Sequence, residues 1–84
     1  MIIKPCYFDA AITILPEENF IKLETVTESD VYTLKEIDLV IEELERYDHN
    51  SPIAVKTDKT DENFDEMDAC DVVELLYEVQ EKYK

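Results

Sequence analysis

The stretch "CYFDAAITILPEENFIKLETV", residues 6–26, decides the fold that we expect for the whole chain. On both sides of the tetrapeptide PEEN (16–19), apolar residues alternate with other residues, which is the period of a β-strand. Proline opens this tetrapeptide, and Asn19 can adopt the left-handed conformation that tight turns use. The pattern predicts a β-hairpin that joins strands over 6–15 and 20–26 through a four-residue loop.

The segment after the hairpin changes from strand period to helix period. Between positions 33 and 50, apolar residues recur three and four apart on one helical face, at Leu34, Ile37, Val40, Ile41, Leu44 and Tyr47. Thr33 and Glu36 have the spacing of a capping box at the helix start. Asn50 followed by Pro52 is a stop signal. The sequence therefore predicts one amphipathic helix over 33–50.

The C-terminal third predicts one more strand and one more helix. "PIAVKT" (52–57) has the composition of a short strand. From about Met67 a narrow apolar stripe has helical spacing, and Asp68 or Asp71 can cap its start; the stripe consists of Val72, Leu75, Leu76, Val79 and Tyr83. We expect an α+β fold, in which a small antiparallel sheet (the hairpin plus a third strand) packs against two helices in the order β-β-α-β-α.

Length and composition predict a single acidic domain over residues 1–84. A chain of 84 residues closes around one core, and 45% hydrophobic residues suffice to build it. No run of about eighteen apolar residues predicts a membrane span, and the N-terminus lacks a secretory pattern, so we expect a cytoplasmic protein without membrane contact. Cys6 and Cys70 are then expected to be free thiols.

The net charge of -14 is the strongest single indication of function. Solubility alone needs a net charge of about 2–8 for a small domain. Residues 1–16 are neutral, whereas eleven acids and three bases give -8 over 17–50, and ten acids and four bases give -6 over 51–84. A charge of this size repels nucleic acid and anionic membranes and speeds association with basic surfaces. The expected partner is therefore a basic protein surface, without direct nucleic-acid binding.

The sequence offers no motif for a metal site. A calcium loop that begins at Asp61 would place Glu66 where the tight turn needs glycine and Val72 where the bidentate acid belongs. The two cysteines and the single histidine are scattered, without the paired spacing of zinc ligands. We expect neither a metal nor a cofactor.

Catalytic motifs are equally absent from the sequence. The chain has no glycine, which excludes glycine-rich phosphate loops. His49 stands among turn residues at the end of the first expected helix, where a histidine interacts favourably with the helix dipole. A chain this short rarely forms the cleft that a pair of catalytic carboxylates needs. We therefore expect a protein that is not an enzyme.

Acidic residues at helical spacing are the candidate partner-binding residues. Four of them recur three, four and three apart, within a spread of about 80° and roughly opposite the apolar stripe of the second helix. The full candidate set is Asp61, Asp65, Asp68, Asp71, Glu74, Glu78 and Glu81, with Asp38, Glu42 and Glu45 of the first helix second. We place Asp61, Asp65 and Asp68 in a loop or first helical turn, where acids suit the positive end of the helix dipole.

The spacing of these acids resembles the spacing of phosphates. Carboxylates three or four residues apart on a helix lie about 5–6 Å apart at Cβ, and DNA phosphates rise about 3.4 Å per residue along one strand. No Lys or Arg stands between positions 60 and 81, whereas an ordinary solvated helix mixes both signs. A solvated face remains the competing explanation, because every amphipathic helix has one.

The function we expect is that of a small acidic inhibitor. It would mimic the nucleic-acid backbone and block a basic groove of a host nucleic-acid-binding or defence protein, such as a restriction or CRISPR component, with a phage as the expected source. The alternative is an immunity protein or antitoxin that neutralises a basic toxin. Tyrosines that serve as interface anchors would favour this alternative, and the candidates are Tyr32, Tyr47, Tyr77 and Tyr83. A third class is an assembly subunit whose acids only solubilise it.

Overall fold

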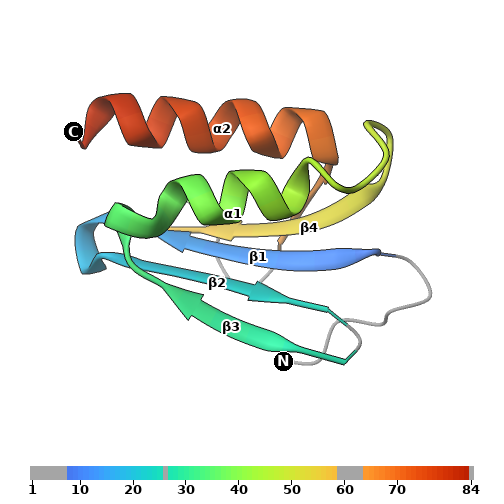
Figure 1. Ribbon diagram of the computed structural model, residues 1–84, viewed down its shortest axis with the longest axis horizontal. Helices are drawn as coiled ribbons and strands as arrows, with labels where there is room; N and C mark the ends of the chain where they lie inside the picture. Colours follow the sequence, from blue (N-terminus) through green and yellow to red (C-terminus); the bar gives the residue numbers. More distant parts are fainter. Residues whose placement is uncertain (1–7, 26, 59–63, 84) are drawn as a thin grey trace.

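The computed structural model describes residues 8–25, 27–58 and 64–83 of the chain (Figure 1). A five-stranded sheet lies under two α-helices. The elements in chain order are β1 (Ala10–Leu15), the 3-10 turn η1 (Pro16–Glu18), β2 (Phe20–Glu24), β3 (Ser29–Tyr32), the 3-10 turn η2 (Leu34–Glu36), α1 (Ile37–Leu44), β4 (Pro52–Thr57), β5 (Asp65–Asp68) and α2 (Ala69–Lys82).

The predicted hairpin is confirmed. Strands β1 and β2 pair antiparallel, from Leu15 opposite Phe20 outward. Asn19 closes the loop with a positive φ of 55°, and its N–H donates to the carbonyl of Pro16 at 3.0 Å. The Asn19 side chain also accepts a hydrogen bond of 2.8 Å from the N–H of Leu34, so one residue fixes both the turn and the start of the helical segment.

The sheet differs from the expected antiparallel one. Its strand order is β3-β2-β1-β4-β5, and β1 pairs with β4 in parallel, so the sheet is mixed. The chain leaves β3 through α1, passes over the sheet and enters β4 beside β1 in the same direction, as a crossover connection requires. Strands β3 and β5 form the two edges, and neither was expected.

Both helices are shorter than the sequence predicts. The expected capping box is present, because the N–H of Thr33 donates to Oε1 of Glu36 at 3.0 Å, but a 3-10 turn separates it from α1. Helix α1 ends at Leu44, whose carbonyl accepts from the N–H of Tyr47 three residues later, a bond that tightens the last turn. Helix α2 begins at Ala69, not near Met67, because the residues before it belong to β5.

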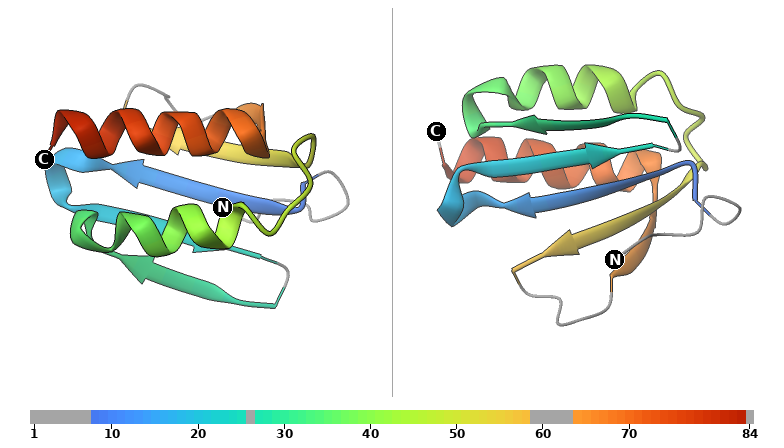
Figure 2. Two further views of the ribbon diagram at one scale, coloured as in Figure 1. Left: turned by 45° about the horizontal axis from the view of Figure 1, so that its top comes forward. Right: turned by 90° about the horizontal axis from the view of Figure 1, so that it is seen from below.

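The hydrophobic core lies between the helices and one face of the sheet (Figures 1 and 2). The largest fully buried side chains come from both layers: Ile12, Ile14, Ile21, Ile53 and Val55 from the strands, and Ile37, Val40, Leu44, Val72 and Leu76 from the helices. The helices run antiparallel, and Nε2 of Gln80 in α2 donates to Oδ1 of Asp38 in α1 at 2.7 Å. Within the described ranges, no helix combines the length and apolar character that a bilayer crossing needs.

The opposite face of the sheet carries charges of both signs. The register places Thr13 of β1 directly between Lys22 of β2 and Lys56 of β4. Lys22 also forms an ion pair of 3.6 Å with Glu24, two residues along the same strand and on the same face. This face therefore lacks the single sign of charge that the sequence predicts for the helices.

Candidate acidic interface on the helix layer

The outer surface of α2 is acidic because apolar and acidic residues alternate with helical period. Val72 and Leu76 are completely buried against the sheet. The four acids of this helix point to the opposite side, and all are exposed: Asp71, Glu74, Glu78 and Glu81. The structure therefore places these predicted residues together on one surface.

Helix α1 adds a second acidic row. Val40 and Leu44 face the core, whereas Asp38, Glu42 and Glu45 are exposed. The bond from Gln80 to Asp38 ties this row to the C-terminal half of α2. The seven exposed acids of the two helices will be called the acidic face: Asp38, Glu42, Glu45, Asp71, Glu74, Glu78 and Glu81.

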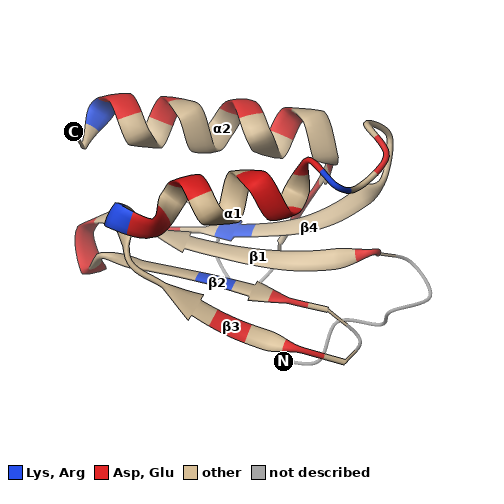
Figure 3. Ribbon diagram, in the orientation of Figure 1, with Lys and Arg blue, Asp and Glu red and all other residues tan. Residues whose placement is uncertain are grey.

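Basic residues border the acidic face and do not interrupt it (Figure 3). The sequences of α1 and of α2 up to Glu81 contain no Lys or Arg. Lys35 precedes α1, Arg46 follows it, and Lys82 ends α2. Arg46 forms an ion pair of 3.3 Å with Glu43, a glutamate outside the acidic face. The face is therefore negative over its whole extent, with basic residues at its margins.

Two predicted candidates do not join this face. Asp65 and Asp68 lie in β5, not in a loop or first helical turn as expected. They are three residues apart on a strand, so their side chains point to opposite faces of the sheet. Asp68 occupies the N-cap position of α2 without a capping bond from its side chain. Asp61 lies outside the described residues.

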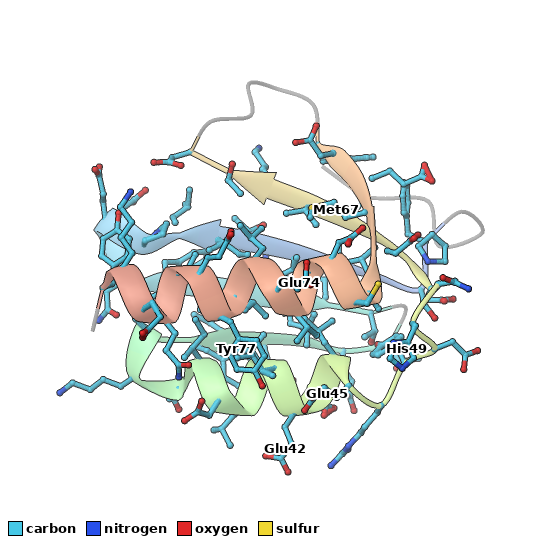
Figure 4. All side chains as sticks on the ribbon, turned by 90° about the horizontal axis from the view of Figure 1, so that it is seen from above. Glu42, Glu45, His49, Met67, Glu74 and Tyr77 are labelled. Carbon is cyan, nitrogen blue, oxygen red and sulfur yellow. The ribbon has the colours of Figure 1, made fainter. Side chains whose placement is uncertain are left out.

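Two exposed apolar residues lie among the acids, and one of them, Leu39, was not predicted from the sequence. Tyr77 lies between α1 and α2, and 48% of its surface is exposed (Figure 4). Leu39 of α1 is 52% exposed. The sequence held a signal for Leu39, because it falls outside the stripe of apolar residues that α1 buries. Residues of this kind are typical anchors of protein interfaces.

The four tyrosines divide into two pairs. Tyr77 and Tyr83 are exposed, the latter by 41%. Tyr32 and Tyr47 are half-buried and pack against the core. Burial raises the pKa of the Tyr47 hydroxyl, and the carboxylates of Glu43, Asp9 and Glu28 raise it further. Of the four candidate anchors, the exposed pair is therefore accessible to a partner in this structure.

The described residues supply little for catalysis or metal binding. Across 8–25, 27–58 and 64–83, no group of three or more His, Cys, Asp or Glu side chains is placed to hold a metal ion. His49 is exposed in a turn, and Cys70, half-buried at the start of α2, carries a free thiol; Cys6 lies outside the described residues. One hollow of about 260 Å³ lies between α2 and the end of the sheet, and another of about 530 Å³ lies where the start of the α1 segment meets the end of α2.

The acidic face is thus a surface that can attract and orient a basic partner through charge. An open hollow of about 580 Å³ lies on it and is lined by Tyr77, Glu78, Glu81 and Lys82. No protein-family model, curated protein or solved structure matches this chain.

Proposed function

We propose that this protein is a small acidic inhibitor that presents its helix layer to a basic, nucleic-acid-binding surface of a partner protein. One observation carries the proposal: seven acids are exposed on two neighbouring helices, and no basic residue stands among them. Surface carboxylates three and four residues apart lie about 5–6 Å apart at Cβ, a spacing comparable with that of backbone phosphates. The mechanism is competition, in which rows of carboxylates occupy arginines and lysines that otherwise bind phosphates.

Physical chemistry supports this function against a purely solubilising one. Like charges on one helix destabilise it by about 0.2–0.5 kcal/mol per pair. Glu74 and Glu78 form such a pair one helical turn apart, and Asp71 and Glu81 extend it on both sides. Solubility could be achieved at lower cost with both signs interspersed, as on the face of the sheet opposite the helices. The accumulated repulsion is relieved when a basic partner docks.

A set of charge-matched variants tests the proposal. One variant neutralises the acidic face of α2 through Asp71→Asn, Glu74→Gln, Glu78→Gln and Glu81→Gln. The control removes the same number of charges at exposed acids outside the two helices, through Asp9→Asn, Glu17→Gln, Glu18→Gln and Glu66→Gln. Both variants have the same net charge, so they differ only in where the charge was removed.

The binding measurement uses a partner captured from a host lysate that binds duplex DNA by itself. We expect the parent protein to compete with the DNA, and the face variant to bind at least about tenfold more weakly, mainly through slower association and with a shallower salt dependence. The control should stay within about twofold of the parent. Equal losses in both variants, or no loss in either, would reduce the face to a solvated surface.

The alternative, an immunity protein or antitoxin, is favoured by one specific observation. Tyr77 and Leu39 are exposed among the acids, and a pure backbone mimic has no use for apolar anchors. Tyr77→Ala separates the two functions. A specific toxin complex should dissociate at least about tenfold faster without this ring at every salt concentration, whereas a phosphate mimic should be nearly unaffected.

A further inference from the structure

Strand β3 is an edge strand, and no other described segment bonds to its outward backbone groups. It is the outermost strand of the sheet on the β2 side (Figures 1 and 2). The N–H of Thr25 donates to the carbonyl of Glu28 at 2.8 Å, so Thr25 and Glu28 form a hydrogen-bonded pair. This pair determines which of the following pairs between β2 and β3 are hydrogen-bonded. Because bonded and non-bonded pairs alternate, Asp30 and Tyr32 bond toward β2. The N–H and C=O groups of Ser29 and Val31 therefore point away from the sheet.

The side chains of β3 do not cover this edge. Its four residues include no proline and no lysine, two of the usual devices that protect edges. Val31 is 62% exposed, more than the other large hydrophobic residues exposed in the described ranges. It lies on the face of the sheet opposite the helices, where it pairs with Lys22. An added strand would gain both backbone hydrogen bonds and an apolar contact.

Carboxylates gather around the same edge. Burial raises the pKa of Tyr32, and the charges of Asp30, Glu43, Glu36 and Glu28 raise it further, which shows that these acids lie within electrostatic reach of one β3 side chain. Asp30 is exposed and, like Tyr32, projects toward the helix side of the sheet. The edge therefore has a strongly negative environment on the side of the helices.

This charge decides which strand the edge can accept. If a second copy of the chain added its own β3 with Ser29 opposite Val31, the two Asp30 side chains would lie directly opposite each other. Like charges at this position destabilise a strand pair. A strand with Arg or Lys opposite Asp30 forms an attractive cross-strand charge pair instead. Charge complementarity therefore selects a basic segment over a second copy.

We propose that the β3 edge binds an extended basic segment of a partner protein by antiparallel strand addition. The segment places a basic residue opposite Asp30 and an apolar residue opposite Val31, and it bonds to the outward groups of Ser29 and Val31. This mode of recognition combines main-chain hydrogen bonds for affinity with alternate side chains for specificity. The edge is separate from the acidic face, so this inference and the proposed function can fail independently.

The first test uses the unaltered protein and synthetic peptides in which arginine and lysine alternate with valine. We expect the peptide to shift the backbone amide resonances of Ser29 and Val31 and to protect both amides from hydrogen exchange. The same peptide N-methylated at its valines keeps every charge and loses the donors that face β3. It should bind at least about tenfold more weakly, since each of the lost hydrogen bonds weakens binding several-fold. A peptide with glutamate in place of the basic residues should not bind.

Two variants test the edge from the protein side. Val31→Pro removes one outward N–H and leaves the bonds of β3 to β2 intact, because edge positions tolerate proline. It should weaken binding of the basic peptide about fivefold. Asp30→Lys keeps the backbone unchanged and should reverse the preference, so that the glutamate peptide binds better than the basic one.

Three results would overturn the inference. The N-methylated peptide could bind as tightly as its parent, which would show charge attraction without strand addition. The peptide-induced shifts could map to the acidic face and leave Ser29 and Val31 unchanged. The unaltered protein could also sediment as a dimer that Val31→Pro or Asp30→Lys dissociates, which would make a second copy the occupant.

Discussion

The inner and outer surfaces of the helix layer differ completely in chemistry, although the same two helices provide both. The inner surface contributes fully buried apolar side chains, among them Val40, Val72 and Leu76. The outer surface carries the acidic face, with Tyr77 between the helices. Stability therefore comes from one side of the layer, whereas the negative charge lies on the other. Changes on the two sides should have separate effects on the molecule.

The largest expected effect compares two leucines on opposite surfaces of the layer. Leu76→Ala should lower the free energy of unfolding by about 3 kcal/mol, because it leaves a cavity at a residue with no exposed surface. Leu39→Ala removes the same atoms from a residue that is 52% exposed, and it should change stability by less than about 0.5 kcal/mol. Urea unfolding measures both values. Similar costs for the two leucines would contradict the division between surfaces.

A smaller effect, of opposite sign, is expected on the outer surface. The double variant Glu74→Gln and Glu78→Gln removes three like-charged pairs at spacings of three and four, including those with Asp71 and Glu81. It should stabilise the protein by about 1 kcal/mol at low salt. The gain should shrink as salt rises, because screening relieves the same repulsion in the parent.

Glu17→Gln together with Glu18→Gln provides the control for that experiment, because these exposed acids lie in η1, away from the helix layer. Thermal unfolding at low and physiological salt compares the two double variants. The same salt dependence in both would show that the repulsion is spread over the molecule and is not concentrated on the acidic face.

The bond between the helices should contribute less. Gln80→Ala removes the 2.7 Å hydrogen bond to Asp38 at an exposed site, and we expect a loss of about 0.5–1 kcal/mol. Gln80→Glu keeps the shape and places a carboxylate opposite Asp38, so it should cost more than the alanine variant. A double-mutant cycle with Asp38→Ala isolates the pair. A coupling energy near zero would mean that the bond does not hold the two acidic rows together.

The smallest expected effect concerns Tyr47 at the boundary of the helix layer. It changes the free energy of unfolding only at alkaline pH. The pKa of Tyr47 is raised above its ordinary value of 10.0, so the folded protein favours the protonated hydroxyl. Its contribution to stability is fully present below pH 10 and is lost as the pH rises through the folded-state pKa. Tyr47→Phe should therefore lose less stability above pH 10 than the parent. Urea unfolding of the variant and the parent below and above pH 10 measures the difference.

Sequence patterns predicted the buried parts of the fold better than its edges. The hairpin of β1 and β2 and the capping box at Thr33 were predicted because their alternation and spacing are local. Strand β3 has exposed Ser29, Asp30 and Val31, so no apolar alternation marks it. An edge strand has only one neighbouring strand, and here its burial is too slight to produce a strand pattern.

The parallel pairing of β1 and β4 could not be derived from periodicity either. The direction of β4 relative to β1 depends on how the chain passes over the sheet through α1, which is a property of the whole fold. A hint was present in β4, where Ile53, Ala54 and Val55 are buried in succession. Such a continuous run is typical of a central strand covered on both faces. The acidic rows of the helices were predicted because helix geometry alone orients them, whereas Asp65 and Asp68 were misplaced because β5 was not expected.

The parallel pair at the centre of the sheet also affects how the protein emerges from the ribosome. Strand β1 can pair with β2 within one local hairpin, but its other edge needs β4, which follows α1 in the chain. Until then the nascent chain exposes an open edge of the apolar strand AAITIL. The segment made in the interval, residues 17–50, carries a net charge of -8, from eleven acids and three bases. We expect repulsion between neighbouring nascent chains to oppose aggregation of the unfinished sheet.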